Sequence, residues 1–175
     1  MQKKTIWDMG RDTVEEFKAK SKIPLTVVLD NVRSLNNIGS VFRTSDAFRV
    51  ERIMLCGITA TPPSPEIHKT ALGAEDSVEW VYFADTMDAL ARLRAEGYTV
   101  CALELVNGAV SLEQYRPDPE GRYAIVAGHE VHGVDQRVVD ACDLCLEIPQ
   151  EGTKHSLNVS VSTALAIWQF YLHLR

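Results

Sequence analysis

The C-terminal part of the chain contains the stretch Ile148-Pro-Gln-Glu-Gly-Thr-Lys-His-Ser-Leu-Asn-Val-Ser-Val-Ser-Thr-Ala-Leu-Ala-Ile-Trp-Gln-Phe170. A strand ends at Pro149, a small polar loop surrounds Gly152, and a helix follows. That helix is apolar on most of its faces, which predicts burial in its own domain or against a partner. Ser156 and Asn158 stand where the loop meets the helix. Short polar side chains at the mouth of a buried helix indicate a binding site.

Upstream of this stretch, short apolar runs alternate with helical segments. We expect strands at 25–30, 52–57, 79–83, 99–103, 123–127 and 144–148, and helices at 38–48, 66–72, 85–96 and 135–141. This alternation predicts an α/β domain with a mostly parallel six-stranded sheet and helices on both faces. The domain is expected to occupy 25–175. A short basic arm at 1–24, with a helix at 13–20 capped by Asp12, is expected to precede it.

The length and composition fit one globular domain. The chain has 175 residues, of which 46% are hydrophobic and 24% are charged. A domain of this size can bury a core without disulfides or metals. No apolar run approaches the ~20 residues of a membrane helix, and the first residues lack the apolar core of a signal peptide. We therefore expect a cytoplasmic protein.

The distribution of charge leaves the partner open. The net charge is −6. The first 52 residues nevertheless carry 10 Lys and Arg against 7 Asp and Glu, so the basic excess lies in the N-terminal third. Such an asymmetry can mark a region that faces nucleic acid, or it can be a solvated helix face.

Two short motifs could suggest a metal, and we predict none. Cys142 and Cys145 have the spacing of half a zinc or redox site, but the chain has no second such pair. His129-Glu-Val-His132 is one residue short of the zinc motif H-E-x-x-H and lies in a glycine-bounded turn. Small buried side chains and a solvated turn are the favoured interpretations.

Polar residues gather after three expected strands, at 30–44, at 127–133 and at 148–158. In parallel α/β sheets ligands bind beyond the carboxyl ends of the strands. The dinucleotide glycine motif, the phosphate-binding P-loop and the serine nucleophile elbow are all missing. The three loops contain glycines, amides, hydroxyls, one arginine and one glutamate. This set suits a polar small molecule held by backbone groups and a hydroxyl acceptor steered towards it.

The three segments resemble the three motifs of the SpoU-type RNA 2′-O-ribose methyltransferases of the α/β-knot (SPOUT) superfamily. The first contains Asn37-Ile-Gly39 followed by Arg43-Thr44. The second contains Gly128-His-Glu130 and Gly133, with His129 where the family usually has Asn. The third is the opening stretch, with 148–152 followed by 156–161. The resemblance covers the chain from about residue 25 to its end.

The resemblance implies a deep C-terminal trefoil knot, a homodimer that completes the site, and transfer of a methyl group from S-adenosylmethionine to a ribose 2′-hydroxyl of tRNA or rRNA. By motif position, the residues that would hold the cofactor are Leu103, Glu104, Gly128, Ile148 and Leu157. Plain core packing is the alternative interpretation for the apolar members.

The residues implied in catalysis are Asn37, Arg43, Glu130, Ser156 and Asn158. A guanidinium stays protonated at all accessible pH, so Arg43 would bind the target phosphate and stabilise the developing alkoxide rather than act as a base. Glu130 would orient Arg43 through a charge-assisted pair. Structural alternatives are that Asn37 caps a helix starting at 38, that Arg43 is a surface residue, and that Ser156 caps the last helix with Asn158 in its first turn.

Two other function classes stay open at this point. One is a methyltransferase of the same fold that acts on a group other than ribose. The other is a non-catalytic RNA- or cofactor-binding protein of this fold. RNA recognition would depend on the main domain, the basic arm and the dimer surface.

Overall fold

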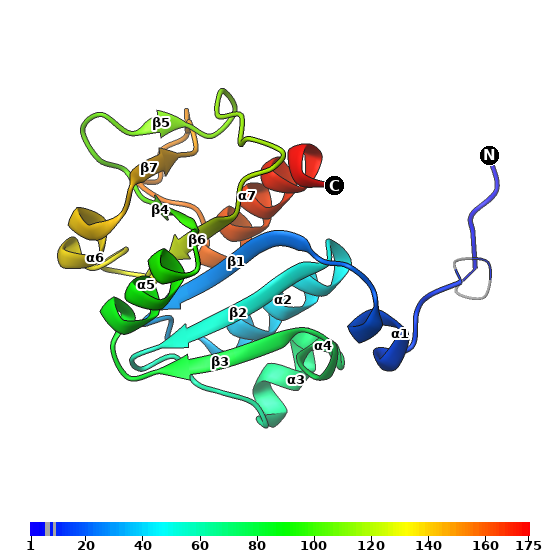
Figure 1. Ribbon diagram of the computed structural model, residues 1–175. Coiled ribbons are helices and arrows are strands. Elements are labelled where there is room, and N and C mark those ends of the chain that lie inside the picture. The colour runs from blue at the N-terminus through cyan, green and yellow to red at the C-terminus, as the bar shows by residue number, and fades with distance from the viewer. Residues whose placement is uncertain (6–7, 9) are drawn as a thin grey trace.

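The computed structural model describes residues 1–5, 8 and 10–175 (Figure 1). The expected arm at 1–24 includes residues 6, 7 and 9, which lie outside the described residues. Within the described part, one sheet has the strand order β3-β2-β1-β6-β4-β7-β5, and every pair of neighbours is parallel. The strands are β1 (Ile23–Asp30), β2 (Val50–Cys56), β3 (Glu79–Phe83), β4 (Thr99–Leu103), β5 (Val110–Ser111), β6 (Tyr123–Ala127) and β7 (Leu144–Glu147).

The prediction of a parallel α/β sheet is confirmed, but the sheet has seven strands instead of six. The missed strand, β5, has only two residues and pairs with the end of β7. Two residues are too short to show the alternation by which a strand is recognised. The six predicted strands are all present, and β1 begins two residues before its predicted start.

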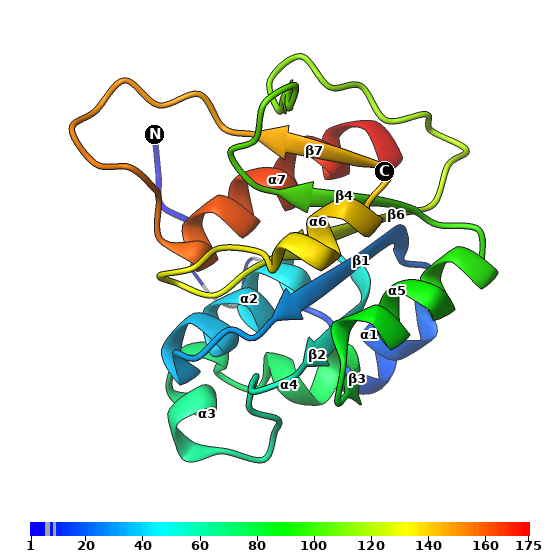
Figure 2. The same cartoon turned by 90° about the vertical axis from the view of Figure 1, so that its left-hand side faces the viewer.

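Helices cover both faces of the sheet (Figures 1 and 2). They are α1 (Val14–Ala19), α2 (Leu35–Ala47), α3 (Pro65–Ala71), α4 (Ala74–Ser77), α5 (Thr86–Ala95), α6 (Gln136–Ala141) and α7 (Val159–Leu174). Buried side chains of α2, α3 and α7 pack on one face, and those of α5 and α6 pack on the other. The central strands are therefore buried on both sides, which explains their continuous apolar sequences. No helix in the described part of the chain is long and apolar enough to cross a bilayer.

The N-caps of three helices differ from the predicted ones. Helix α2 begins at Leu35, with Ser34 as its N-cap, so Asn37 lies inside the first turn and does not cap the helix. Helix α7 begins at Val159 and Asn158 is its N-cap, in place of Ser156. At the arm, Thr13 forms a capping box with Glu16, and Asp12 pairs with Lys20 instead of capping. In each case several neighbouring residues can cap, and sequence alone does not select among them.

Gly39 of the first motif lies at the contact between α2 and α3. A Cβ atom there would stand 2.1 Å from Thr70 Oγ1 and 2.2 Å from the Ile67 carbonyl oxygen. The Thr70 hydroxyl also donates a hydrogen bond to the Asn36 carbonyl, at 2.9 Å. This glycine is thus required for the close approach of the two helices, which fixes α2 relative to the sheet.

Helix α7 is buried on one face only. The buried face contains four residues with 0% exposure: Thr163, Ala166, Ile167 and Phe170. On the opposite face four apolar side chains, which we call the α7 stripe, are 40–49% exposed; they are Val161, Leu165, Trp168 and Leu172. Phe48, at the end of α2, packs against the rings of Trp168 and Tyr171 with centroid distances of 5.4 and 5.1 Å. The predicted burial of this helix therefore holds for one face in the single chain.

Candidate active site

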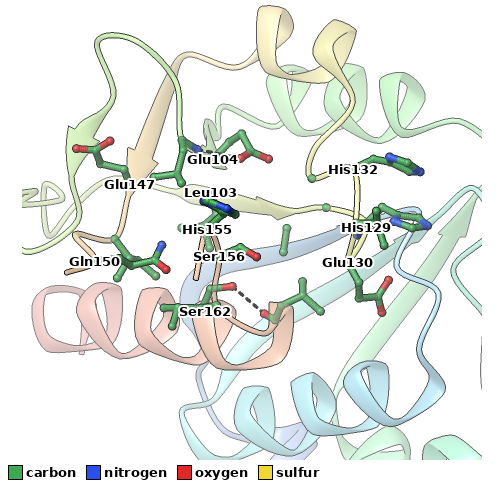
Figure 3. A pocket seen from close by; sticks show the side chains of 18 of the residues that line it. Leu103, Glu104, His129, Glu130, His132, Glu147, Gln150, His155, Ser156 and Ser162 are labelled. Carbon is green, nitrogen blue, oxygen red and sulfur yellow. Dashed lines mark hydrogen bonds between the residues drawn. The ribbon is translucent and has the colours of Figure 1, made fainter. Parts of the chain in front are cut away.

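A pocket of about 310 Å³ lies at the carboxyl ends of β4, β6 and β7 (Figure 3). Figure 2 shows the loop between β7 and α7 projecting beyond these strand ends. The pocket is lined by seven of the ten residues predicted for the site: Leu103, Glu104, Gly128, Glu130, Ile148, Ser156 and Leu157. Buried Leu146 and Val159 add apolar surface to its wall. Its volume falls within the range of small-molecule sites.

The second motif forms a tight turn on one side of this pocket. The amide of His129 donates to the carbonyl of Gly133 at 2.9 Å, and the amide of Gly133 donates back at 2.8 Å. A Cβ atom at Gly128 would stand 2.2 Å from the backbone of Gly133 and Val134. Gly133 itself has φ +69°. Both glycines are therefore needed to close the turn, whatever they bind.

Glu104 joins β4 to this turn. Its carboxylate accepts hydrogen bonds from the backbone N–H of Leu105 and of Val134, each at 2.9 Å. A Cβ atom at Gly133 would lie 2.1 Å from Glu104 Oε2. The side chain predicted to contact a cofactor thus also holds two of the pocket walls together.

Glu130 is bound to the N-terminus of α2. Its carboxylate accepts from the backbone N–H of Arg33 at 3.0 Å, from that of Ser34 at 2.8 Å, and from Asn37 Nδ2 at 3.0 Å. Partial burial acts to raise the pKa of this carboxyl, but the hydrogen bonds from the two amides and from Asn37 outweigh it and lower the pKa from 4.5 to about 2. Glu130 is therefore anionic at neutral pH, where the helix N-terminus favours a negative charge.

The predicted pair between Glu130 and Arg43 is not formed. Helix α2 begins three residues earlier than expected, so the backbone N–H groups of Arg33 and Ser34, just before the helix, meet the carboxylate. Arg43 is exposed, does not line the pocket, and makes no hydrogen bond or ion pair with another described residue. Asn158, another residue implied in catalysis, is hydrogen-bonded to Asn37 and not to Arg43.

A chain of side-chain hydrogen bonds joins the three motifs. Asn158 Oδ1 accepts from the N–H groups of Ser160 and Val161 and so caps α7. Its Nδ2 must then point away from the helix, and it donates to Asn37 Oδ1 at 3.1 Å. Asn37 in turn uses Nδ2 for Glu130. The orientation of both amides is fixed by the helix cap at one end and the carboxylate at the other.

Several pocket residues were not predicted as site residues. Among them are Leu105, His129, Val131, His132, Glu147, Gln150, His155 and Ser162. His129 and His132 were considered only as a possible metal motif. Among the described residues there is no group of three metal-ligating side chains.

Burial raises the pKa of the Cys142 thiol to about 12, so this thiol is protonated at neutral pH.

A model of the SpoU rRNA Methylase family matches residues 24–168. The chain belongs to this family. The resemblance inferred from the three motifs is thereby confirmed, and residues of the second and third motifs line the pocket.

Three relatives illustrate the similarity. The 23S rRNA (guanosine-2′-O-)-methyltransferase RlmB of Shewanella oneidensis is 28% identical over 161 residues, which are 92% of this chain and 64% of that protein. The AdoMet-bound rRNA methyltransferase from Sinorhizobium meliloti superposes with a TM-score of 0.80 at 27% identity, over 93% of this chain and 60% of that one. A structure described as giving insights into the 2-OH methylation of C/U34 on tRNA has a TM-score of 0.76 at 27% identity, over 86% of this chain and 95% of its own.

Proposed function

We propose that this chain transfers the methyl group of S-adenosylmethionine to a ribose 2′-hydroxyl of tRNA or rRNA. The observation that carries the proposal is the meeting of three distant motifs at one pocket, joined through Glu130, Asn37 and Asn158. Family membership supports it, as do the rRNA and tRNA ribose substrates in the names of relatives. The chain spans 64% of the length of RlmB, so the activity of the whole relative is transferred here as a proposal.

The pocket fits S-adenosylmethionine in its chemistry. Apolar side chains suit the adenine, and the backbone groups of lining residues such as Gly128, Ile148 and Leu157 suit its polar edges and the amino-acid part. We assign Leu103, Glu104, Gly128, Ile148 and Leu157 to cofactor binding. The bound cofactor supplies a methyl group activated by the sulfonium. The protein must then position the ribose hydroxyl in line with that methyl and favour loss of its proton.

Within this proposal Glu130 is a positioning residue. A carboxyl with a pKa of about 2, with both oxygens occupied by donors, is a poor acceptor for the proton of a ribose hydroxyl. Its carboxylate holds Asn37 and the start of α2 instead. Ser156 lines the pocket with an exposed hydroxyl and can contact the ribose. Arg43 would stabilise the alkoxide and the target phosphate once it is brought to the pocket.

A homodimer is part of the proposal. The α7 stripe exposes four apolar side chains on one helix face, and apolar patches of this kind mark interaction surfaces. Phe48 joins the stripe to the end of α2, the helix that carries Arg43. A second copy that covers the stripe would lie beside α2 and complete the site. The trefoil knot and a cytoplasmic location stay predictions of the same kind.

The test uses labelled S-adenosylmethionine with bulk tRNA and rRNA, followed by nuclease digestion and separation of the nucleosides. Label in 2′-O-methylated nucleosides supports the proposal. Label in a base instead would favour a methyltransferase of this fold with another target, and cofactor binding without any transfer would favour a non-catalytic protein. Arg43→Ala should lose transfer and keep cofactor binding. Arg92→Ala, which removes an exposed cation from α5 on the other face of the sheet, is the matched control.

A further inference from the structure

Three of the five histidines of the chain line the pocket, and no Phe, Tyr or Trp among the described residues does. His129 and His132 lie together on the turn of the second motif. Figure 3 shows them on one side of the pocket, with Glu147 and Gln150 on the other. Their rings project away from Leu103 and His155, so they form the rim of the pocket rather than its floor. This position leaves them available to a second ligand while the pocket holds a cofactor.

The two imidazoles form an ordered pair. Their ring centroids are 4.8 Å apart and their planes are inclined by 34°. The amide of Val131 donates to His129 Nδ1 at 3.0 Å, which fixes the orientation of that ring and leaves Nε2 facing outwards. The turn behind them is closed by the two hydrogen bonds between His129 and Gly133. Val131, between the two histidines, is 74% exposed and adds an apolar surface.

The carboxylates of Glu104 and Glu130, which line the same pocket, are not paired with these imidazoles. Both oxygens of Glu130 accept hydrogen bonds from the start of α2, and both oxygens of Glu104 accept from backbone amides. Neither His129 nor His132 makes an ion pair with another described residue. A metal is a poor fit, because Nδ1 of His129 is already occupied and the described residues offer no third ligand.

We propose that His129 and His132 form a stacking platform for a nucleobase of the RNA next to the ribose that enters the pocket. The inference rests on the proposed function, since it takes RNA as the substrate. Unpaired bases in RNA stack on aromatic side chains, histidine among them, and each such contact contributes strongly to binding. The platform would hold the flanking base and so position the ribose. His132, which is exposed, carries most of the contact, and His129 supports it from beneath.

The test compares two single-stranded RNA probes of about twelve nucleotides, one of adenosines and one of abasic ribose phosphates, in the presence of S-adenosylhomocysteine. Both carry the same phosphates, so their difference in affinity reports the bases. The wild-type chain should bind the adenosine probe about tenfold more tightly than the abasic one. His132→Ala should remove most of this difference without changing abasic binding, and His132→Phe should keep it. Equal binding of the two probes by the wild-type chain, or binding of neither, would overturn the proposal.

Further measurements distinguish loss of the imidazole ring from disruption of the turn and from loss of a phosphate contact. His129→Asn keeps a side-chain acceptor for the Val131 amide and removes the ring, so it should lower the preference for adenosine while the thermal stability is kept. His68→Ala, at an exposed position of α3, is the control and should change neither affinity. Stacking predicts that His132→Ala leaves the salt dependence of binding unchanged. A phosphate contact would reduce the slope by about one, and that result contradicts stacking.

The same preparations distinguish failure of the stacking platform from failure of the proposed methyltransferase function. Cofactor binding by calorimetry and methyl transfer to bulk RNA are measured for each variant. If the wild-type chain transfers methyl groups to ribose but does not prefer adenosine, only the stacking platform fails. If it transfers none, the proposed function fails.

Discussion

Replacement of Asn158 by aspartate tests the hydrogen-bond chain that joins the three motifs. Aspartate caps a helix as well as asparagine, so Oδ1 can still accept from Ser160 and Val161. The atom that changes is Nδ2, which donates to Asn37 Oδ1 at 3.1 Å. In the variant an oxygen faces that acceptor. Asn37 cannot restore the contact by rotating its amide, because its oxygen would then face the Glu130 carboxylate.

The substitution is expected to change the free energy of unfolding in two opposite ways, one through the helix and one through the lost hydrogen bond. A negative charge at the first turn of α7 should stabilise the helix by about 0.3–1 kcal/mol. Loss of the hydrogen bond, with two acceptors left facing each other, should cost about 1–2 kcal/mol. The net loss in the free energy of unfolding should therefore lie between about 0 and 1.7 kcal/mol. Methyl transfer should fall about tenfold or more, because ~1.4 kcal/mol of lost positioning in the transition state is a factor of ten in rate.

The assay pairs thermal unfolding with single-turnover methyl transfer for Asn158→Asp and Asn158→Ala. Alanine removes both the cap and the donor, so it should lower stability by about 0.5–2 kcal/mol as well as activity. The reasoning is refuted if the aspartate variant transfers methyl groups at the wild-type rate. It is also refuted if aspartate destabilises the protein as much as alanine does.

Three other changes have defined outcomes. Gly39→Ala should lower the free energy of unfolding by about 1–3 kcal/mol in urea, because its Cβ would overlap the Ile67 carbonyl, whereas Gly152→Ala, with no atom within 4 Å, should be neutral. The pKa of Glu130 is lowered on folding, so its contribution to stability is present above pH 4.5 and is lost as the pH falls towards 2; the stability difference between the wild type and Glu130→Gln, roughly 1–2 kcal/mol after allowance for solvent, should shrink over that range. Trp168→Glu should turn the proposed dimer into a monomer in sedimentation velocity, and a dimer of unchanged affinity would contradict the role of the α7 stripe.

The sheet could be predicted because its strands are long enough to show their pattern. Continuous β-branched runs such as 25–30 mark strands covered on both faces, and six of the seven were identified. Val110–Ser111 pairs only because β7 lies beside it, and no local pattern indicates that contact. The start of α2 was misplaced because Ser34 and Asn37 are both good caps, and the apolar period between them is too weak to decide.

The sequence identified the residues of the site more successfully than the contacts between them. Seven of the ten residues line one pocket, and Asn37 and Asn158 are hydrogen-bonded to it. The partners of Glu130 were missed because two of them are backbone N–H groups, which residue types do not reveal. Arg43 was the obvious ionic partner in the sequence, yet it is exposed and forms no ion pair with the carboxylate, which binds Arg33, Ser34 and Asn37 instead. The roles of these residues in catalysis stay predictions.

The central claim is that the three motifs build a ribose methyltransferase. Alkaline hydrolysis tests it directly, because cleavage of RNA by base needs a free 2′-hydroxyl. The purified chain is incubated with S-adenosylmethionine labelled in the methyl group and with bulk tRNA and rRNA, and the RNA is then hydrolysed completely in alkali. The label is expected in alkali-resistant dinucleotides. Label found only in mononucleotides, or no label in the RNA at all, would contradict the claim.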